Sequence, residues 1–393
     1  MLKDVGVTGN GEFGTVLTLD KRPSLICFSH LRWDFVFQRP QHLLSRFAST
    51  HAVHYWEEPV FVPALVQPHL ETRLAAKNLT VVTPHLPEGL SEEMVEAQLR
   101  RLLNGYPAAA SPEILWYYTP MMLPFSRQLE AACIVYDCMD ELANFRFAPP
   151  RLLDLEAELF ERADLVFTGG YSLYEAKRSR HGSVHPFPSS VDIAHFAQAR
   201  AIPTENSVPT FGFYGVLDER FDIDLVAAVA DARPDWRFIM VGPIVKISPD
   251  DLPKRANIFY PGAAAYEDLP GLLAEWDVAL MPFAINDATR FISPTKTPEY
   301  LAAGKPVVST PIRDVVRHYG RLEGVKIAST PDDFVTGCDE ALALTRSDGE
   351  WLAEVDQALS SMSWDITQAR MAGLIAQVVG DDQDTAVSAE VVA

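Results

Sequence analysis

The stretch SPTKTPEYLAAGKPVVST holds the side chains of this sequence that are best suited to chemistry on a phosphate. Thr297 is a good helix N-cap, Pro298 suits the first helical position and Gly304 ends the helix. The N-terminus of such a helix presents free N–H groups and partial positive charge to an anion. Lys296 adds a full charge, and Glu299 can accept hydrogen bonds from a vicinal diol such as a ribose. The pattern predicts a nucleotide-phosphate site; the alternative is a well-capped helix whose Lys296 and Glu299 are merely solvated.

A second candidate for phosphate binding is Arg220, in the stretch GFYGVLDERFD. A strand is expected to end at Gly215 in this stretch, and the loop that follows leads into a helix. Arg220 therefore lies near the carboxyl end of a strand, where its guanidinium can bind a diphosphate through two parallel hydrogen bonds. The alternative is a surface arginine paired with a neighbouring acid, Asp218, Glu219 or Asp222.

Backbone groups after two further expected strands could face the same ligand. Gly242 follows the strand expected at 237–241 and lets the backbone approach a nucleotide closely. Main-chain groups between Tyr260 and Ala263, which include Gly262, are expected to meet the base.

The N-terminal half places polar side chains in the loop after its first expected strand, in the stretch FSHLRWDFVFQRPQH. Arg39 and Gln41 could hold a phosphate of the ligand or a second substrate. His30 and Asp34 could touch the part of the ligand beyond the phosphate. Each of the four could instead have a structural role.

Acidic side chains follow another expected strand of this half, in the stretch YDCMDE. Asp137 or Asp140 could face the cleft there, and we prefer Asp140 as a base that accepts a proton from a substrate hydroxyl. A small basic cluster, Lys177, Arg178 and Arg180, is interpreted as a solvated helix face rather than as a patch for a lipid-linked acceptor.

Short apolar runs of strand length alternate with amphipathic segments, which is typical of parallel sheets covered on both faces by helices. The first half has expected strands at 24–28, 51–56, 79–83, 113–118, 133–137 and 165–168, and helices at 41–49, 91–103 and 151–162. The second half has expected strands at 210–216, 237–241, 257–260, 278–282 and 306–310, and helices at 222–232, 269–275, 298–303 and 331–343. A polar break with two prolines, at 198–209, separates two doubly wound halves, whose ligands belong at the C-terminal ends of strands and in the cleft between them.

The composition narrows the possible partners and compartments. The 393 residues carry a net charge of −20, which argues against a nucleic-acid partner and allows at most peripheral contact with a membrane. The 4 cysteines include no C-x-x-C pair, so we expect buried, reduced thiols. The sequence shows neither a signal peptide nor an apolar stretch of the roughly 20 residues that spans a bilayer. These features predict a cytoplasmic protein.

Two motif matches are set aside because their contexts do not fit the chemistry. GNGEFG, at 9–14, is a literal G-x-G-x-x-G, but a polar segment precedes it and a β-like segment follows, so a flexible glycine turn is the better interpretation. Asp222 and Asp224 form a D-x-D at the start of an expected helix, where capping is favoured over metal binding. No cluster of residues has the spacing of a transition-metal site, so we expect neither a metal nor a cofactor.

The stretch around Lys296 and Glu299 resembles the nucleotide-sugar site of GT-B glycosyltransferases, especially the retaining family 4 and its bacterial members similar to teichuronic acid glycosyltransferases. Further segments that resemble this family are YPG at 260–262, WDVALMPF at 276–283, ADLVFT at 163–168, VDIAHF at 191–196 and SWD at 363–365. The resemblance implies that Lys296 contacts a diphosphate, Glu299 a ribose and Arg220 a phosphate.

The resemblance implies an α/β fold of two Rossmann-like, doubly wound domains that face each other across a cleft (GT-B), with a C-terminal crossover helix. The expected parts are a tail at 1–20, an N-terminal acceptor domain at 21–198, a nucleotide-sugar domain at 199–363, the crossover helix at 364–380, which packs on the N-terminal domain, and a tail at 381–393. The implied activity is a metal-independent, retaining transfer of the hexosyl type, from a nucleotide diphosphate sugar to a saccharide or lipid-linked acceptor in cell-surface polysaccharide synthesis. The alternatives are a sugar-nucleotide epimerase of the same architecture and a non-catalytic nucleotide-sugar-binding protein.

The residues assigned to this activity fall into three groups. The catalytic candidates are Asp140, His30, Arg220 and Lys296. The donor-binding candidates are Gly215, Arg220, Gly242, Tyr260, Gly262, Ser293, Thr295, Lys296 and Glu299. The acceptor or sugar candidates are Asp34, Arg39 and Gln41.

The sequence departs from the family pattern at two places. Many members have a glutamate eight residues before the ribose-binding one, where this chain has Phe291. The usual Asn-Gly before the Val-Asp pair is replaced by Ser189 and Ser190. We expect the sugar contacts of the missing glutamate to come from Asn286 or from the residues between Thr289 and Ser293.

Overall fold

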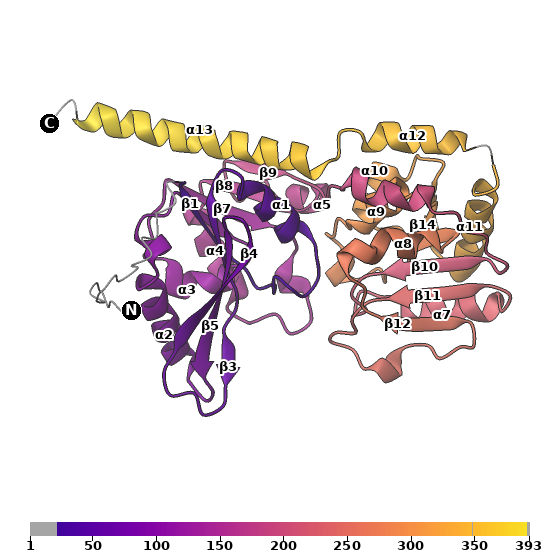
Figure 1. Cartoon of the computed structure of the whole chain (residues 1–393), viewed down its shortest axis with the longest axis horizontal. Helices are drawn as coiled ribbons and strands as arrows, with labels where there is room; N and C mark the ends of the chain where they lie inside the picture. The colour runs from indigo at the N-terminus through magenta and orange to yellow at the C-terminus, as the bar shows by residue number, and fades with distance from the viewer. Residues whose placement is uncertain (1–21, 348, 391–393) are drawn as a thin grey trace, which may run out of the picture.

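Two α/β domains make up the computed structural model, which describes residues 22–347 and 349–390, with side chains to residue 380. Figure 1 shows the two domains next to each other, with a long C-terminal helix running back along the N-terminal domain. The N-terminal tail and its glycine motif at 9–14 lie outside the described residues. The described helices include none that is both long and apolar enough to cross a membrane.

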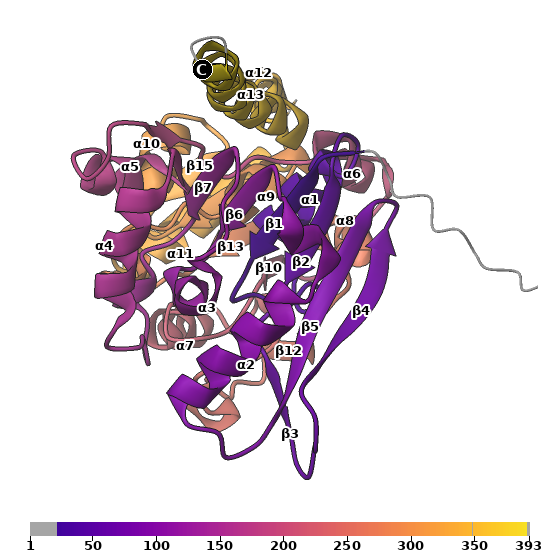
Figure 2. The ribbon, with the colours of Figure 1, turned by 90° about the vertical axis from the view of Figure 1, so that its left-hand side faces the viewer.

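The N-terminal domain contains a sheet of 9 strands in the order β3-β5-β2-β1-β6-β7-β8-β9, with β4 also paired to β5. Its strands are β1 (Ser24–Phe28), β2 (Ala52–Trp56), β3 (Val60–Val62), β4 (His69–Ala76), β5 (Leu79–Pro87), β6 (Ile114–Tyr117), β7 (Cys133–Cys138), β8 (Leu165–Thr168) and β9 (Val184–Pro186). All neighbours are parallel except β4 and β5, which form the long antiparallel hairpin visible in Figure 2. Its helices are α1 (Arg39–Phe47), α2 (Glu92–Asn104), α3 (Leu123–Ser126), α4 (Leu152–Arg162), α5 (Tyr171–Lys177) and α6 (Ile193–Phe196).

Both faces of this sheet are buried, because each central strand sends alternate side chains into two different cores. In β1, Leu25 and Cys27 join the core that includes Leu43 of α1. Ile26 and Phe28 join the opposite core, which α2 and α4 cover. This explains why the central strands read as continuous apolar runs rather than as alternating ones.

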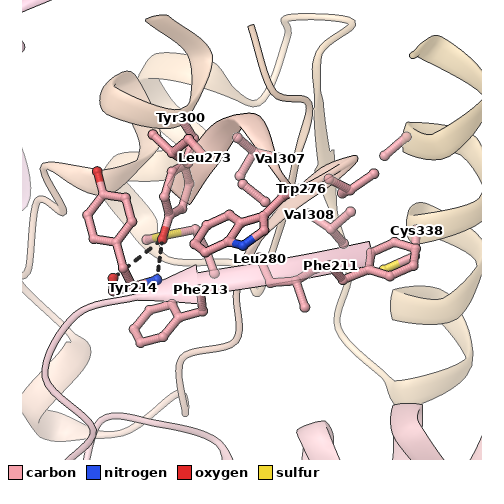
Figure 3. Close-up of a cluster of buried hydrophobic side chains, with 14 of the residues drawn as sticks. Phe211, Phe213, Tyr214, Leu273, Trp276, Leu280, Tyr300, Val307, Val308 and Cys338 are labelled. Carbon is pink, nitrogen blue, oxygen red and sulfur yellow. Dashed lines mark hydrogen bonds between the residues drawn. The ribbon is translucent and has the colours of Figure 1, made fainter. Parts of the chain in front are cut away.

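The C-terminal domain contains 6 parallel strands in the order β12-β11-β10-β13-β14-β15. The strands are β10 (Thr210–Tyr214), β11 (Arg237–Val241), β12 (Ile258–Gly262), β13 (Val278–Met281), β14 (Val307–Ser309) and β15 (Val325–Ile327). The helices are α7 (Ile223–Ala232), α8 (Leu269–Ala274), α9 (Lys296–Ala302), α10 (Arg313–Tyr319), α11 (Pro331–Leu344) and α12 (Glu350–Leu359). Part of its core, around the strand β10, is drawn in Figure 3.

The chain crosses between the domains at two adjacent places. The N–H of Val191 donates to the carbonyl of Met362 at 2.9 Å, which ties the first crossing to the second. Helix α13 (Trp364–Glu390) then packs on α1, and its Met371 and Ile375 complete the apolar core on that face. The crossover helix predicted from the sequence is therefore present, and the helix continues through residues 381–390.

Most of the predicted elements are confirmed, and the differences have identifiable causes. The strand β4 was missed because its side chains are mostly exposed and polar, and β3, β9 and β15 because they have only three residues. Helices α3, α5, α6, α10 and α12 were also missed. All four cysteines are buried and free, as expected.

The interpretation of Lys177, Arg178 and Arg180 as a solvated helix face is wrong for Lys177, whereas Arg178 and Arg180 are exposed as expected. Lys177 is 4% exposed, and its Nζ lies 2.9 Å from Oε1 of Glu156 and 2.8 Å from Oε2 of Glu141. Arg180 pairs with the same Glu156. The acids come from separate elements, so the local sequence gave no sign of this buried ion cluster.

Candidate functional site

A cavity of about 490 Å³ lies between the two domains, within the size range of small-molecule sites. The N-terminal domain contributes the loop between β1 and α1, from Trp33 to Gln38. The C-terminal domain contributes the ends of β10 and β11, the loop before α8, and the first turn of α9. The lining thus gathers the C-terminal ends of parallel strands, where α/β proteins bind ligands.

The helix α9 brings two of the predicted residues into this cavity. It begins at Lys296 rather than at Pro298, so the prediction of Thr297 as N-cap was wrong. The earlier start is possible because Pro298 at the third helical position gives up an N–H that has no partner inside the helix in any case. Gly304 ends the helix as predicted, with φ of +74°.

Lys296 lines the cavity from the first position of α9. Within the described residues, no hydrogen bond or ion pair holds its ammonium group, although Glu299, Asp218 and Asp140 act on it electrostatically. Burial lowers the pKa of Lys296, and the neighbouring Arg220 lowers it further. A cation placed in this way is available to an anionic ligand.

Glu299 lies one turn further along α9 and is 5% exposed. Its Oε2 accepts a hydrogen bond of 2.5 Å from the hydroxyl of Tyr214, at the end of β10. Burial raises the pKa of Glu299, while this hydrogen bond and Lys296 oppose the rise. Both Glu299 and Tyr214 line the cavity.

Arg220 also lines the cavity, and it is held by a neighbouring acid. Asp218 accepts from Nε at 3.0 Å and from Nη2 at 2.6 Å, which is a bidentate pair. The pairing considered as the alternative is thus present, and it orients the guanidinium at the ligand space instead of removing it to the surface. Arg220 Nη1 is named in none of the hydrogen bonds between described residues.

Two glycines shape the floor below these charged groups. A Cβ on Gly215 would lie 2.2 Å from Cε of Lys296, and a Cβ on Gly242 would lie 1.8 Å from the carbonyl oxygen of Gly215. Their φ angles are +145° and +148°, which disfavour any other residue. Both line the cavity.

The residues after β12 that line the cavity lie further along the chain than the predicted segment from Tyr260 to Ala263. Tyr260 and Gly262 do not line it, and the Tyr260 hydroxyl donates to the carbonyl of Pro253 at 3.2 Å. The lining residues are instead Ala263 to Glu267.

In the N-terminal domain, Arg39 and Gln41 are buried beneath the cavity. Asp137 accepts from Nη2 of Arg39 at 2.8 Å, and the carbonyl of Phe187 accepts from its Nη1 at 2.8 Å. The Gln41 amide donates to the carbonyl of Trp33 at 2.7 Å. Neither side chain lines the large cavity; Gln41 fixes the loop that does, through Trp33 and the N–H of Gln38.

Asp140 faces a smaller side cavity of about 100 Å³, which Arg220, Lys296 and Arg39 also line. Burial raises the pKa of Asp140 to about 6, and the three cations limit the rise. The structure therefore brings Asp140 together with both predicted phosphate-binding cations.

His30 and Asp34 lie at different depths in the loop after β1. Asp34 lines the large cavity but is exposed, and it pairs with Arg73. His30 lines neither of these two cavities. Burial and the neighbouring Lys246 lower the pKa of His30 to about 4, so the ring is neutral near pH 7.

Ser293 and Thr295 belong to the segment that joins the side cavity to α9. The hydroxyl of Ser189 donates to the carbonyl of Ser293 at 2.5 Å, which links the domains through one of the serines that depart from the family pattern. Ser293 lines the side cavity, and Thr295 lines both cavities.

Phe291, at the position of the missing glutamate, packs against the core of the N-terminal domain. Asn286 and Thr289, expected to replace that glutamate, bond to each other: the Thr289 N–H donates to Oδ1 of Asn286 at 3.1 Å. Neither lines the cavities described above.

A segment after β7 bridges the two domains beside the site. The Asn144 amide donates to the carbonyl of Asp287 at 3.1 Å. The ring of Phe145 lies between two cations of the other domain, 5.5 Å from the Arg220 guanidinium carbon and 5.0 Å from Nζ of Lys246. The bridge formed by Asn144 and Phe145 therefore contacts a residue of the site directly.

Sequence reasoning missed the aromatic side of the site. Trp33, Phe35 and Phe37 line the cavity, and Phe37 stacks on Tyr266 of the other domain at 4.3 Å. Phe35 is 50% exposed. Three aromatic residues in a five-residue loop could have indicated a ligand surface, whereas the role of Tyr214 has no signature outside the structure.

The sequence comparisons place the C-terminal domain among known families. Residues 209–343 match the family of glycosyl transferases group 1. A Bacillus subtilis (strain 168) protein described as a teichuronic acid biosynthesis glycosyltransferase is 26% identical over 264 residues. That match covers 60% of this chain and 66% of the relative, just under two thirds of its length.

The structural comparisons cover nearly the whole chain. Sucrose-phosphate synthase from Thermosynechococcus elongatus matches with a TM-score of 0.70 and 15% identity, over 92% of this chain and 100% of the other. HepE from Anabaena, in complex with UDP and glucose, matches with a TM-score of 0.67 and 13% identity, over 90% of this chain and 100% of the other. These neighbours and the two sheets, which are parallel except for the β4–β5 pair, show the GT-B fold.

Proposed function

We propose that this GT-B protein, related to glycosyltransferases of bacterial polysaccharide synthesis, transfers a sugar from a nucleotide diphosphate donor with retention of configuration and without a metal ion. The observation that carries the proposal is the position of Lys296: its ammonium group has no hydrogen bond or ion pair within the described residues and lines the interdomain cavity beside Arg220. A pyrophosphate is the ligand that best satisfies two such cations. The UDP bound by the Anabaena neighbour, within the same fold, supports this choice.

The donor would lie across the end of the C-terminal sheet. Glu299 would accept hydrogen bonds from the ribose hydroxyls, and the backbone around Gly215 and Gly242 would pass close to the diphosphate. The segment from Ala263 to Glu267 would meet the base. Lys296 and Arg220 would stabilise the negative charge that grows on the departing diphosphate, which is the dominant electrostatic contribution in such a reaction.

The transfer breaks the bond between the anomeric carbon and the diphosphate oxygen and forms a bond to the acceptor oxygen on the same face. The sugar passes through an oxocarbenium-like state, so no protein nucleophile is needed. Asp140 would take the proton from the acceptor hydroxyl, and its raised pKa suits a base near neutral pH. Contact between the domains would exclude water and limit hydrolysis of the donor.

The D-x-D at 222–224 gives no support to a metal-dependent alternative. Asp222 caps α7, with Oδ1 accepting from the N–H of Leu225 at 2.9 Å. We therefore expect turnover to persist in EDTA; loss of turnover in EDTA and its recovery with magnesium would contradict the metal-free mechanism.

We further propose a saccharide or lipid-linked acceptor in cell-surface polysaccharide synthesis, because the Bacillus subtilis relative is described with teichuronic acid biosynthesis. Uridine, guanosine and adenosine diphosphate sugars can be compared by thermal shift and then by slow donor hydrolysis. Conversion of the donor into an epimer in the absence of acceptor would instead indicate an epimerase. Tight nucleotide binding without consumption of donor would indicate a binding protein.

Lys296→Ala is the decisive variant for this proposal. Loss of a charge-assisted contact of about 1.5–3 kcal/mol predicts a fall in donor turnover of at least about tenfold. Lys254→Ala is the matched control, because Lys254 is an exposed lysine of the same domain whose partner is Asp250. Near-normal kinetics of Lys296→Ala would remove Lys296 from the site.

A further inference from the structure

The contact between the last residue of β10 and the first turns of α9 has a consequence for nucleotide selection. We propose that Tyr214 is a positioning residue that holds the Glu299 carboxylate for a ribose diol and so sets the preference for ribonucleotides over deoxyribonucleotides. This inference rests on the proposed function, because it assumes that Glu299 binds the ribose.

Hydrogen bonds hold Tyr214 in two places, at its side-chain hydroxyl and at its backbone. Its hydroxyl donates to Oε2 of Glu299 at 2.5 Å, between two buried groups. Its backbone N–H donates to the hydroxyl of Tyr300 at 3.0 Å, and that hydroxyl lies 3.4 Å from the Tyr214 carbonyl oxygen. Figure 3 shows these two contacts of Tyr300 as dashed lines, with Tyr214 at the end of its strand. The rings of the two tyrosines meet edge to face at 4.9 Å.

The Glu299 carboxylate needs such a partner because binding a vicinal diol requires one particular orientation of the carboxylate. Two adjacent hydroxyls can donate to one carboxylate only when both oxygens face them, and a flexible glutamate loses side-chain entropy on adopting that arrangement. Lys296, on the same helix, attracts the carboxylate toward the phosphate side of the cavity. The hydrogen bond from Tyr214 fixes Oε2 in advance. The Thr295 side chain also bonds to the carboxylate, and the acceptor capacity that then remains serves the diol.

Only the ionised carboxylate offers acceptors to both hydroxyls, so the protonation state of Glu299 matters. The titratable groups that face it are Tyr214 from β10, Lys296 and Tyr300 from α9, Tyr266 from the segment before α8, and Tyr319 from α10; the Thr295 side chain also bonds to it. Burial raises the pKa of Tyr214 well above its ordinary value, so its hydroxyl remains a donor. Removal of this hydroxyl takes away one of the interactions that lower the pKa of Glu299, and that pKa must then rise.

The test is the affinity of Tyr214→Phe for a ribonucleoside diphosphate and for its 2′-deoxy analogue, measured by calorimetry between pH 5.5 and 8. The pair used is UDP, GDP or ADP, whichever binds the wild-type protein. We expect roughly five- to thirtyfold weaker binding of the ribonucleotide, from loss of about one to two kcal/mol, and little change for the deoxynucleotide. The loss should be largest at low pH and should recover as the pH rises through the raised pKa of Glu299.

Tyr319→Phe is the matched control, because it removes another buried hydroxyl near Glu299 that bonds to the sulfur of Met362 instead. It should leave the preference unchanged. In Glu299→Gln the preference should be lost, and addition of Tyr214→Phe should then weaken binding no further, which tests the coupling even if the single Tyr214 variant is poorly folded.

The outcomes separate the two proposals. If Glu299→Gln loses the preference for ribose while Tyr214→Phe keeps it at every pH, the inference about Tyr214 is wrong and the proposed function stands. If the wild-type protein binds none of the three diphosphates, the proposed function fails, and the inference falls with it.

Discussion

Arg39 and Asp137 form an ion pair in the interior of the N-terminal domain, with Nη2 of the arginine 2.8 Å from Oδ1 of the aspartate. Their side chains are 4% and 0% exposed. The pair joins the first turn of α1 to the end of β7, the two elements whose adjoining loops carry Gln38 and Asp140. The Arg39 guanidinium is therefore bonded inside the N-terminal domain, although it also lines the side cavity that Asp140 faces.

Removal of one member of this pair should destabilise the domain strongly. Arg39→Met leaves a buried carboxylate without its cation, which typically costs about 3–5 kcal/mol of unfolding free energy. Urea unfolding followed by tryptophan fluorescence measures the loss. Arg73→Ala, which breaks the exposed pair with Asp34, is the control and should cost at most about 1 kcal/mol. Equal effects of the two substitutions would contradict the structural role of Arg39.

Gly215→Ala should damage the site more than the fold. The new methyl group would lie 2.2 Å from Cε of Lys296, so the lysine must move, and the φ of +145° is unfavourable for alanine. We expect at least about tenfold weaker nucleotide binding, in line with loss of a charge-assisted contact.

Gly271→Ala provides the comparison for this variant, because a Cβ there meets nothing within 4 Å. It lies in α8, where alanine should be neutral or stabilise the helix by up to about 1 kcal/mol. A Gly215→Ala protein that binds nucleotide normally would show that the Lys296 position is not critical.

The raised pKa of Asp140 predicts how turnover depends on pH. Its pKa of about 6 lies above the ordinary value of 3.8, so the folded state favours the protonated carboxyl. As a base it must be ionised, and turnover should therefore fall as the pH drops below about 6. A rate that stays constant from pH 7 to pH 5 would exclude this role.

The raised pKa of Asp140 has the opposite consequence for folding stability, which it favours at low pH. A buried carboxyl with a raised pKa contributes most to stability below its unfolded pKa, and that contribution is lost as the pH rises through the folded pKa. Asp140→Asn should therefore lose activity while its thermal unfolding temperature at pH 8 is no lower than that of the wild type.

We expect the Phe145 ring, which contacts Arg220 across the domain interface, to help orient the Arg220 guanidinium. Phe145→Ala removes a ring that lies against two cations, each contact being worth about 0.5–2 kcal/mol. We expect a higher KM for the donor, with a smaller effect on kcat. Phe147→Ala is the control on the same loop, since Phe147 is 81% exposed and should tolerate the change. A parallel loss in both variants would indicate a general disturbance of the loop.

The sequence predicts the two-domain fold well because the central strands are buried on both faces and read as apolar runs. It also singles out Lys296, Glu299, Gly215 and Arg220, which the structure places around one cavity, because their local structure depends on neighbours within a few residues. What it does not reveal are pairings between distant elements. One example is the ion pair between Glu156 and Lys177: the sequence predicted a solvated lysine, whereas the structure shows a buried one.

Phe291 is a second residue whose contacts with distant elements could not be predicted from the sequence. A phenylalanine at a glutamate position suggested a change in sugar contacts, because only the family pattern was available as a guide. The structure places its ring against the core of the other domain. That apolar surface is formed by residues far away in the sequence, so no local pattern could have predicted the contact.

Helix α13 makes the N-terminal domain depend on residues that are distant in the sequence. Met371 and Ile375 fill an apolar face whose other members, such as Leu43 and Leu25, are translated more than three hundred residues earlier. During synthesis the leading half therefore leaves the ribosome with that face uncovered and remains unfinished until the final helix arrives. A fragment that ends before Trp364 should expose this surface, bind a hydrophobic dye and be prone to aggregate, whereas the full chain conceals it.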